Sequence, residues 1–144
     1  MTKITEQIFI TLADFIGPTQ REVLLDLVLY SEEKEFFREK LVHYAQRVAS
    51  MPQTYEQDGK GDKATAYLHY FTAGMDWYIT EKDMGSDGDD APGQHQAFGL
   101  ADLGHGEPET GYINLAEALK AGAELDLYFE PKTLGEIKAK MGGN

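Results

Sequence analysis

Cysteine is absent from the 144-residue sequence, and lysine and arginine are absent from residues 83–119. Without cysteine the protein has no disulfide bond, no thiolate metal ligand and no thiol nucleophile. No apolar run approaches the roughly 20 residues that span a bilayer. The first residues, MTKITEQIF, lack the basic and then apolar layout of a signal peptide. We therefore expect a soluble cytoplasmic protein with no membrane partner.

Acidic side chains outnumber basic ones by 25 to 13, which gives a net charge of −12. The excess is concentrated in the stretch that lacks lysine and arginine, which carries Asp83, Asp87, Asp89, Asp90, Asp102, Glu107, Glu109 and Glu117. A field of this sign repels phosphate backbones, so direct nucleic-acid binding is not expected. Two interpretations stay open. The acids lie in solvated loops that keep a small protein soluble, or they form a surface that attracts a basic partner.

The apolar pattern predicts a single domain over residues 1–144, with helices in 1–50. Apolar residues recur at helical spacing from Ile4 to Ile16, and Gly17-Pro18 stops this first helix. Thr19 with Glu22 fits a capping box for a second helix. Its core, 23–29, is apolar on nearly every side and also fits a buried strand. Ser31 favours the start of a third helix, which ends near Met51-Pro52.

After a loop at 53–63, a two-residue repeat predicts β-strands. Strands are expected at 66–71, 76–81, 95–101, 109–113 and 125–130, and the first two form a hairpin around 72–74. Capping patterns at Asn114 with Glu117 and at Thr133 with Glu136 predict two short helices. Helices first and strands afterwards indicate an α+β fold, with the N-terminal helices packed on one face of a small antiparallel sheet.

The strand alternation also predicts a face rich in tyrosine and carboxylates. If the side of Trp77 and Ile79 and the side of Leu125, Leu127 and Phe129 are buried, the opposite sides carry Asp76, Tyr78, Thr80, Asp126, Tyr128 and Glu130. Such a face can stack, accept hydrogen bonds and pair with Arg or Lys. The alternative is an ordinary solvated face, or one that a helix partly covers.

Four segments carry a family resemblance: TAYLHYFTAGMDWYITEKD (65–83), QHQAFGLADL (94–103), GYINLAEAL (111–119) and AELDLYFEPKTLGEI (123–137). In this order, with MPQTYEQDGKGDKA (51–64) as a lead-in, residues 51–138 resemble a domain family of unknown function carried on bacterial plasmids and phages. The resemblance implies a mobile-element setting near genes for conjugation, replication or evasion of host defence. It implies no catalytic residues.

Candidate catalytic and metal-binding chemistry is weakly supported. Glu81, Asp83, His95 and His105 can converge if the segments 75–83 and 95–103 pair, but no tight metal-ligand spacing is present. His69, between Tyr67 and Phe71, is typical of a hydrogen-bonded core histidine. Phosphate-binding and serine-hydrolase motifs are missing. Tyr55, Glu56 and Asp58 form either a structural turn or a pocket rim. We expect no cofactor and no metal.

The function that this pattern favours is a non-enzymatic acidic interaction protein of a mobile element. It would inhibit a basic nucleic-acid-binding host protein, such as a nuclease or another defence protein, by mimicking nucleic acid. The expected binding residues are Asp76, Tyr78, Asp83, Asp87, Asp89, Asp90, Asp126, Tyr128 and Glu130.

Two alternatives stay open. One is a small enzyme or ligand-binding domain with a pocket between the hairpin and the N-terminal helices, lined by Trp77, Tyr78, Glu81, Asp83 and His95. The other is a scaffold that dimerises through residues 23–29. The oligomeric state is not fixed by the sequence.

Overall fold

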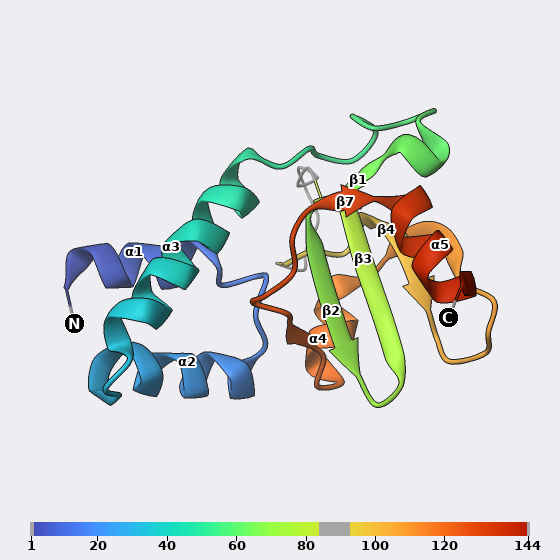
Figure 1. Ribbon diagram of the computed structural model, residues 1–144. Helices are drawn as coiled ribbons and strands as arrows, with labels where there is room; N and C mark the ends of the chain where they lie inside the picture. The colour runs from blue at the N-terminus through green and yellow to red at the C-terminus, as the bar shows by residue number, and fades with distance from the viewer. Residues whose placement is uncertain (1, 84–92, 144) are drawn as a thin grey trace.

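Three helices open the chain, in a computed structural model that describes residues 2–83 and 93–143. They are α1 (Lys3–Thr11), α2 (Pro18–Tyr30) and α3 (Lys34–Ser50), and they lie together to one side of the sheet (Figure 1). The helical interpretation of 23–29 is confirmed, because this stretch lies inside α2. The expected binding residues Asp87, Asp89 and Asp90 lie outside the described residues.

A five-stranded antiparallel sheet follows, with the order β5-β4-β3-β2-β6. Its strands are β2 (Leu68–Thr72), β3 (Met75–Glu81), β4 (Ala97–Asp102), β5 (Glu109–Ile113) and β6 (Glu124–Leu125). The remaining elements are the 3₁₀ turn η1 (Gly61–Lys63), α4 (Leu115–Lys120), α5 (Leu134–Gly143), and β1 (Thr65–Ala66), which pairs with β7 (Lys132–Thr133). The α+β fold class and the β2–β3 hairpin are confirmed.

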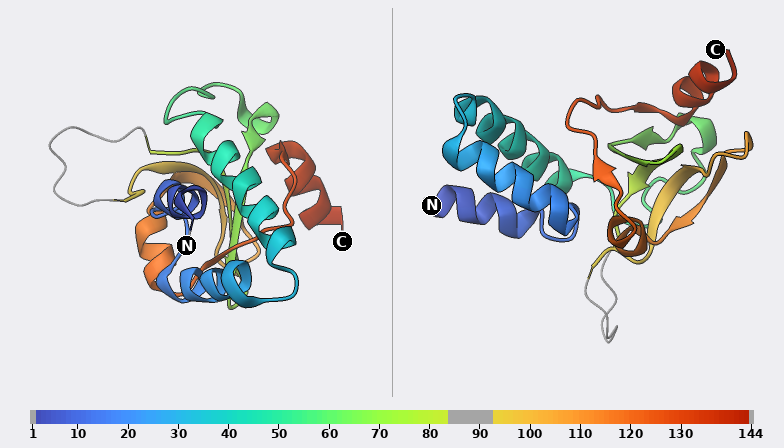
Figure 2. Two further views of the ribbon diagram at one scale, coloured as in Figure 1. Left: turned by 90° about the vertical axis from the view of Figure 1, so that its left-hand side faces the viewer. Right: turned by 90° about the horizontal axis from the view of Figure 1, so that it is seen from below.

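The two faces of the sheet bury different partners. One face shares the main core with α1, α2, α3 and α4, through side chains such as Leu41, Tyr70 and Ile79. The other face carries a smaller cluster in which Leu134 and Ile137 of α5 pack against Leu100. Figure 2 shows the N-terminal helices and α5 at opposite sides of the molecule. The face of Tyr78 is thus partly covered by a helix.

Local signals set several of the element boundaries. Asn114 Oδ1 accepts a hydrogen bond from the Glu117 backbone N–H at 3.1 Å, so the capping box that opens α4 is confirmed. The box proposed at Thr19 is wrong. Because Pro18 supplies the first helical residue without needing a partner for its nitrogen, α2 begins there, and its N-cap Gly17 makes no side-chain hydrogen bond.

Two predicted segments are shorter than expected. α1 ends at Thr11, and Leu12 to Ile16 continue as turns while Leu12, Phe15 and Ile16 stay buried. The strand expected at 125–130 has register pairs with β2 only at Glu124 and Leu125, followed by one backbone hydrogen bond from the Asp126 N–H to the His69 carbonyl at 2.9 Å. Beyond that point the alternation of burial persists, since Leu127 and Phe129 are 9% and 7% exposed, but the chain leaves the ladder.

A β-bulge at Thr80 changes which side chains share a face. Ile79 pairs with Gly99 and Glu81 with Phe98, so Thr80 is an extra residue in β3. Thr80 lies on the side expected for it, since it lines a cavity with Phe98 and Leu134, but it is covered there and only 1% exposed. Glu81 is turned away from the side of Ile79 to the side of Phe98. β4 approaches closely here, since a Cβ on Gly99 would collide with the Tyr78 carbonyl oxygen.

Candidate functional site

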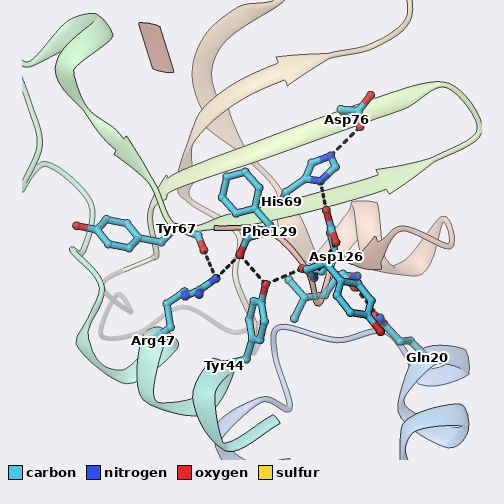
Figure 3. A network of polar contacts seen from close by, with 10 residues as sticks. Gln20, Tyr44, Arg47, Tyr67, His69, Asp76, Asp126 and Phe129 are labelled. Carbon is cyan, nitrogen blue, oxygen red and sulfur yellow. Dashed lines mark hydrogen bonds and ion pairs between the residues drawn. The ribbon is translucent and has the colours of Figure 1, made fainter. Parts of the chain in front are cut away.

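His69 is the centre of a polar network on the face of the sheet that α5 partly covers. It lies on β2 with a 13% exposed side chain, and its two ring nitrogens contact two carboxylates. Nε2 lies 2.7 Å from Asp76 Oδ1, and Nδ1 lies 2.9 Å from Asp126 Oδ2 (Figure 3). Only a ring protonated at both nitrogens can donate to both carboxylates. The prediction that His69 is a hydrogen-bonded residue is confirmed.

The segment 124–130, which supplies Asp126, is held by side chains from the N-terminal helices. Gln20 of α2 donates to the Leu125 carbonyl at 2.9 Å and accepts from its N–H at 2.8 Å. The Tyr44 hydroxyl lies 2.8 Å from the Asp126 carbonyl oxygen and 3.0 Å from that of Phe129, and it shares its one proton between them. Figure 3 shows these groups converging on the segment from two helices. Side-chain donors thus take over where the β6 ladder ends.

Arg47 of α3 completes this anchoring. Its Nη1 donates to the Phe129 carbonyl at 2.9 Å and to the Tyr67 carbonyl at 3.3 Å. The guanidinium also lies over the Tyr44 ring, 4.4 Å from its centroid. The segment is therefore fixed to both the helices and the sheet, and the position of the Asp126 carboxylate follows from that.

Tyr78 reports the electrostatics of this face. Its ring stacks on the His69 ring, with centroids 4.5 Å apart and planes 10° apart. Burial, together with the charges of the Asp76, Asp102 and Asp126 carboxylates, raises the pKa of Tyr78 to about 12. The Tyr78 hydroxyl therefore keeps its proton and stays a hydrogen-bond donor, in a local field dominated by three acids.

The strand register aligns acidic side chains across the end of the sheet that carries the hairpin turn. Asp102 pairs with Asp76, Asp76 with Phe71, and Phe71 with Glu124. Directly paired residues share a face and lie about 5 Å apart, so these four residues form one continuous row, which we call the acidic row. Asp126 lies beside it. Phe71 is an exposed aromatic ring inside the row.

Two lysine side chains lie beside the acidic row on the side of α5. Lys132 and Lys140 line a cavity of about 340 Å³ together with His69, Tyr78 and Asp126. The negative surface therefore extends away from α5, toward Asp102 and Glu124. Glu107 and Glu109, both exposed, follow on the loop and strand next to Asp102.

The structure brings together three of the expected binding residues and separates the others. Asp76, Tyr78 and Asp126 meet at His69. Tyr128 instead faces Lys40 of α3, whose Nζ lies 4.9 Å from the ring centroid. Glu130 is exposed and lies 4.0 Å from Arg47 Nη2. Asp83 accepts backbone hydrogen bonds from His95 and Gln96, both at 3.1 Å.

The five residues of the alternative pocket do not line one cavity. Trp77 is buried in the main core, whereas its neighbour Tyr78 points to the other face of the sheet. Glu81 is turned into the 53–57 loop, where it accepts two backbone hydrogen bonds. Asp83 and His95 lie next to each other beyond the end of β3. Within the described residues, these five side chains therefore lie in separate places: the main core, the opposite face, the 53–57 loop and the end of β3.

The described residues hold neither a metal-ligand cluster nor a membrane-spanning helix. Within 2–83 and 93–143, no three His, Asp or Glu side chains are grouped so as to hold a metal ion. His105, one of the residues considered for such a group, follows β4 at the opposite end of the sheet from Glu81. Among the helices that the structure describes, none combines the length and apolar character needed to cross a bilayer.

Sequence reasoning missed the central position of His69 and the contribution of Asp102, Glu124 and Phe71 to the acidic row. Each of these depends on which residues face one another across strands. The sequence does indicate two of the carboxylates, Asp76 and Asp126, because each alternates with buried residues along a predicted strand and so belongs to the opposite side. The histidine that joins them becomes visible only with the register.

A family model described as "Protein of unknown function (DUF2958)" matches residues 38–138. The chain belongs to this family. No curated protein and no solved structure matches it. The match confirms an uncharacterised domain family and begins inside α3, earlier than the resemblance at 51–138 placed it. Of the labelled network residues in Figure 3, all but Gln20 fall inside the family region.

Proposed function

We propose that this chain is a non-catalytic protein that binds a basic partner protein through the acidic row. The observation that carries the proposal is the register of β4, β3, β2 and β6, which places Asp102, Asp76 and Glu124 in one line. A line of carboxylates at strand spacing offers a cationic groove a fixed series of acceptors. The exposed ring of Phe71 adds an apolar contact within the same line.

The arrangement of His69 supports a role in binding rather than in general acid–base catalysis. Both of its nitrogens are engaged by carboxylates at 2.7 and 2.9 Å, so neither is aimed at a substrate. The carboxylates are in turn held in fixed orientations, with exposed fractions of 34% for Asp76 and 27% for Asp126. Carboxylates held this way lose little side-chain freedom when a partner arginine or lysine pairs with them.

The net charge of −12 adds a long-range attraction toward basic proteins. In this proposal the partner is a nucleic-acid-binding host protein, such as a nuclease of a defence system, and the chain occupies its nucleic-acid groove. The setting would be the cytoplasm of a bacterium that carries a plasmid or phage, which is the setting implied by the family resemblance. Direct binding to nucleic acid is not expected, because both surfaces are negative.

The test compares two variants with the same change in charge. One replaces acids at the acidic end of the sheet: Asp102→Asn, Glu107→Gln, Glu109→Gln and Glu124→Gln. The control replaces four exposed acids of the helical region, three on α2 and α3 (Glu22→Gln, Asp26→Asn and Glu39→Gln) and one in the turn between them (Glu32→Gln). Both leave His69, Asp76 and Asp126 untouched, so the network that holds the segment 124–130 is preserved.

Basic proteins of a bacterial lysate, enriched on heparin, are passed over each immobilised form at low and at physiological salt. We expect the unmodified chain and the control to retain a common protein and to displace DNA from it. The variant with the four substitutions at the acidic end of the sheet should associate with that protein at least about tenfold more slowly. The attraction should weaken at higher salt, since charges are screened over about 8 Å at physiological ionic strength. Equal retention by both variants, or retained proteins that still bind DNA normally, would contradict the proposal.

A further inference from the structure

A second cavity lies on the same face of the sheet as the acidic row, at the opposite end. It has a volume of about 420 Å³ and is enclosed by the 53–64 loop, β3, β4, β5 and the start of α5. Its size is within the range of small-molecule sites, about 300–1,000 Å³. The residues that matter below are Tyr55, Asp58, Glu81, Phe98 and Tyr112. None of the residues used in the acidic row lines it.

Three aromatic rings form the wall of this cavity. Phe98 and Tyr112, paired across β4 and β5, meet edge to face with centroids 5.5 Å apart and planes 89° apart. Tyr55 from the loop meets Tyr112 at 6.4 Å and 82°. The two hydroxyl oxygens lie 2.7 Å apart and share a hydrogen bond. Rings set at right angles to one another present both faces and edges to the enclosed space.

Two carboxylates give the cavity a negative potential. Glu81 is 4% exposed, and its two oxygens accept the backbone N–H groups of Tyr55 and Gln57 at 2.8 and 2.6 Å. Asp58 lies on the loop above it. The hydrogen bond with Tyr55 raises the pKa of Tyr112, as do burial and the charges of Asp58 and Glu81, so both carboxylates act at this hydroxyl. Among the lining residues that the structure describes, none is Lys, Arg or His.

The loop holds its tyrosine at the rim at an energetic cost. Tyr55 has φ +79°, a left-handed conformation that bulky side chains rarely adopt. The bulge at Thr80 turns Glu81 toward this loop, and the Glu81 carboxylate then fixes the Tyr55 and Gln57 amides. Backbone strain of this kind persists only where surrounding contacts over-determine it, and it clusters at ligand-binding sites. The ring of Tyr55 is thereby fixed in position before any ligand arrives.

We propose that this cavity binds an organic cation, an alkylated ammonium or guanidinium group, against the rings of Tyr55, Phe98 and Tyr112. Aromatic faces attract cations that shed water easily, and the two carboxylates supply the opposite charge. A metal ion fits less well, because it requires several converging oxygen or nitrogen ligands and both oxygens of Glu81 already accept amide hydrogen bonds. The cation is either a free small molecule or a side chain of a partner protein. This inference goes beyond the proposed function and does not depend on it.

The first measurement uses the unmodified chain and two probes that differ in charge alone. The probes are choline and its uncharged isostere, in which a tert-butyl group replaces the trimethylammonium group. Aromatic resonances of Tyr55, Phe98 and Tyr112 are followed by NMR during each titration. We expect choline to move them with a Kd near about 1 mM, and the isostere to bind at least about tenfold more weakly. Equal binding of the two, or no shift with choline at about 10 mM, overturns the proposal.

Variants then locate the site. Tyr112→Leu should weaken choline binding at least about fivefold, because a cation–π face is lost. Tyr128→Leu, the matched control, removes an exposed tyrosine elsewhere and should leave binding unchanged. Asp58→Asn should weaken binding about threefold, whereas Asp26→Asn on α2 should not. Equal effects of the two members of either pair contradict the assignment of the site.

A peptide arm distinguishes the two sources of the cation. Short peptides carry one trimethyllysine or one arginine between uncharged residues and are titrated in the same way. Binding of these peptides at least about tenfold tighter than choline assigns the cavity to a partner's side chain. If the peptides bind no more tightly than choline, the cavity is assigned to a free small molecule. Failure of every probe overturns the inference and leaves the acidic row, at the other end of the sheet, unaffected.

Discussion

Replacing His69 with alanine is the sharpest perturbation of the network that orders the acidic face. The substitution removes both hydrogen bonds, at 2.7 and 2.9 Å, and leaves the carboxylates of Asp76 and Asp126 facing each other without a bridge. It also removes the ring that stacks on Tyr78 at 4.5 Å. All three losses weaken the attachment of the segment 124–130 to β2.

The expected cost follows from the exposure of the partners. Hydrogen bonds to charged groups contribute about 1.5–3 kcal/mol each. The low end of that range applies, since the carboxylates are 34% and 27% exposed and water can solvate them after the change. The lost stack adds about 0.5–1.5 kcal/mol. Because water recovers part of the two hydrogen bonds, His69→Ala should lower the free energy of unfolding by about 2–4 kcal/mol, which corresponds to a Tm lower by about 5–12 °C.

Urea unfolding monitored by circular dichroism measures this cost, and two further variants divide it. His69→Phe keeps a ring over Tyr78 but cannot bridge the acids, so the difference between the Phe and Ala variants measures the stack. A double-mutant cycle with Asp126→Asn should give a coupling energy above about 1 kcal/mol. The reasoning is refuted if His69→Ala costs less than about 1 kcal/mol, or as little as the exposed control His43→Ala.

Three further predictions concern the same face and its support. The free energy of unfolding should fall between about pH 10, where the unfolded tyrosine ionises, and the Tyr78 pKa of about 12, because the unfolded chain loses this proton first. Asp102→Asn should lower the pKa of Tyr78, as measured by an ultraviolet titration. Gly99→Ala should cost about 2–4 kcal/mol because its Cβ meets the Tyr78 carbonyl, whereas Gly111→Ala, which meets nothing within 4 Å, should cost far less. Tyr44→Phe removes two hydrogen bonds to backbone carbonyls, so amide exchange in 124–130 should accelerate, at a cost of about 1–2 kcal/mol.

Sequence periodicity predicted the elements whose cause is local. The β2–β3 hairpin follows from alternation on both sides of Ala73-Gly74, whose φ values of 38° and 84° fit a tight hairpin turn. The cap at Asn114 follows from one side chain and an amide three residues away. In such elements the residues that determine the structure are neighbours in the chain, so a single sequence contains the whole cause.

The bulge at Thr80 has no such local cause. Alternation puts Glu81 on the side of Ile79, whereas the register shift against β4 turns Glu81 to the other face. The shift belongs to the pairing of two strands that are distant in the sequence. Glu81 therefore lines the cavity near Tyr55 rather than a pocket with Trp77.

The segment after β6 shows a second limit. Leu125, Leu127 and Phe129 alternate with polar residues and are all buried, which is why a strand was expected. Burial of alternate residues does not require a ladder when other donors satisfy the backbone carbonyls. Tyr44 supplies such donors here, from 82 and 85 residues away in the sequence. The hydrophobic pattern therefore predicted burial correctly and strand pairing incorrectly.

The separation of the two candidate sites follows from the antiparallel sheet itself. β3 carries Asp76, in the acidic row, near its start and ends at Glu81, which lines the Tyr55 cavity. Between them, α5 covers the same face through Leu134 and Ile137. The acidic row depends on strand register and on His69, whereas the cavity depends on the bulge and on the 53–57 loop. A substitution in the acidic row leaves the bulge and the 53–57 loop intact, and a substitution in the cavity leaves the strand register and His69 intact. Either proposal can therefore be refuted while the other still stands.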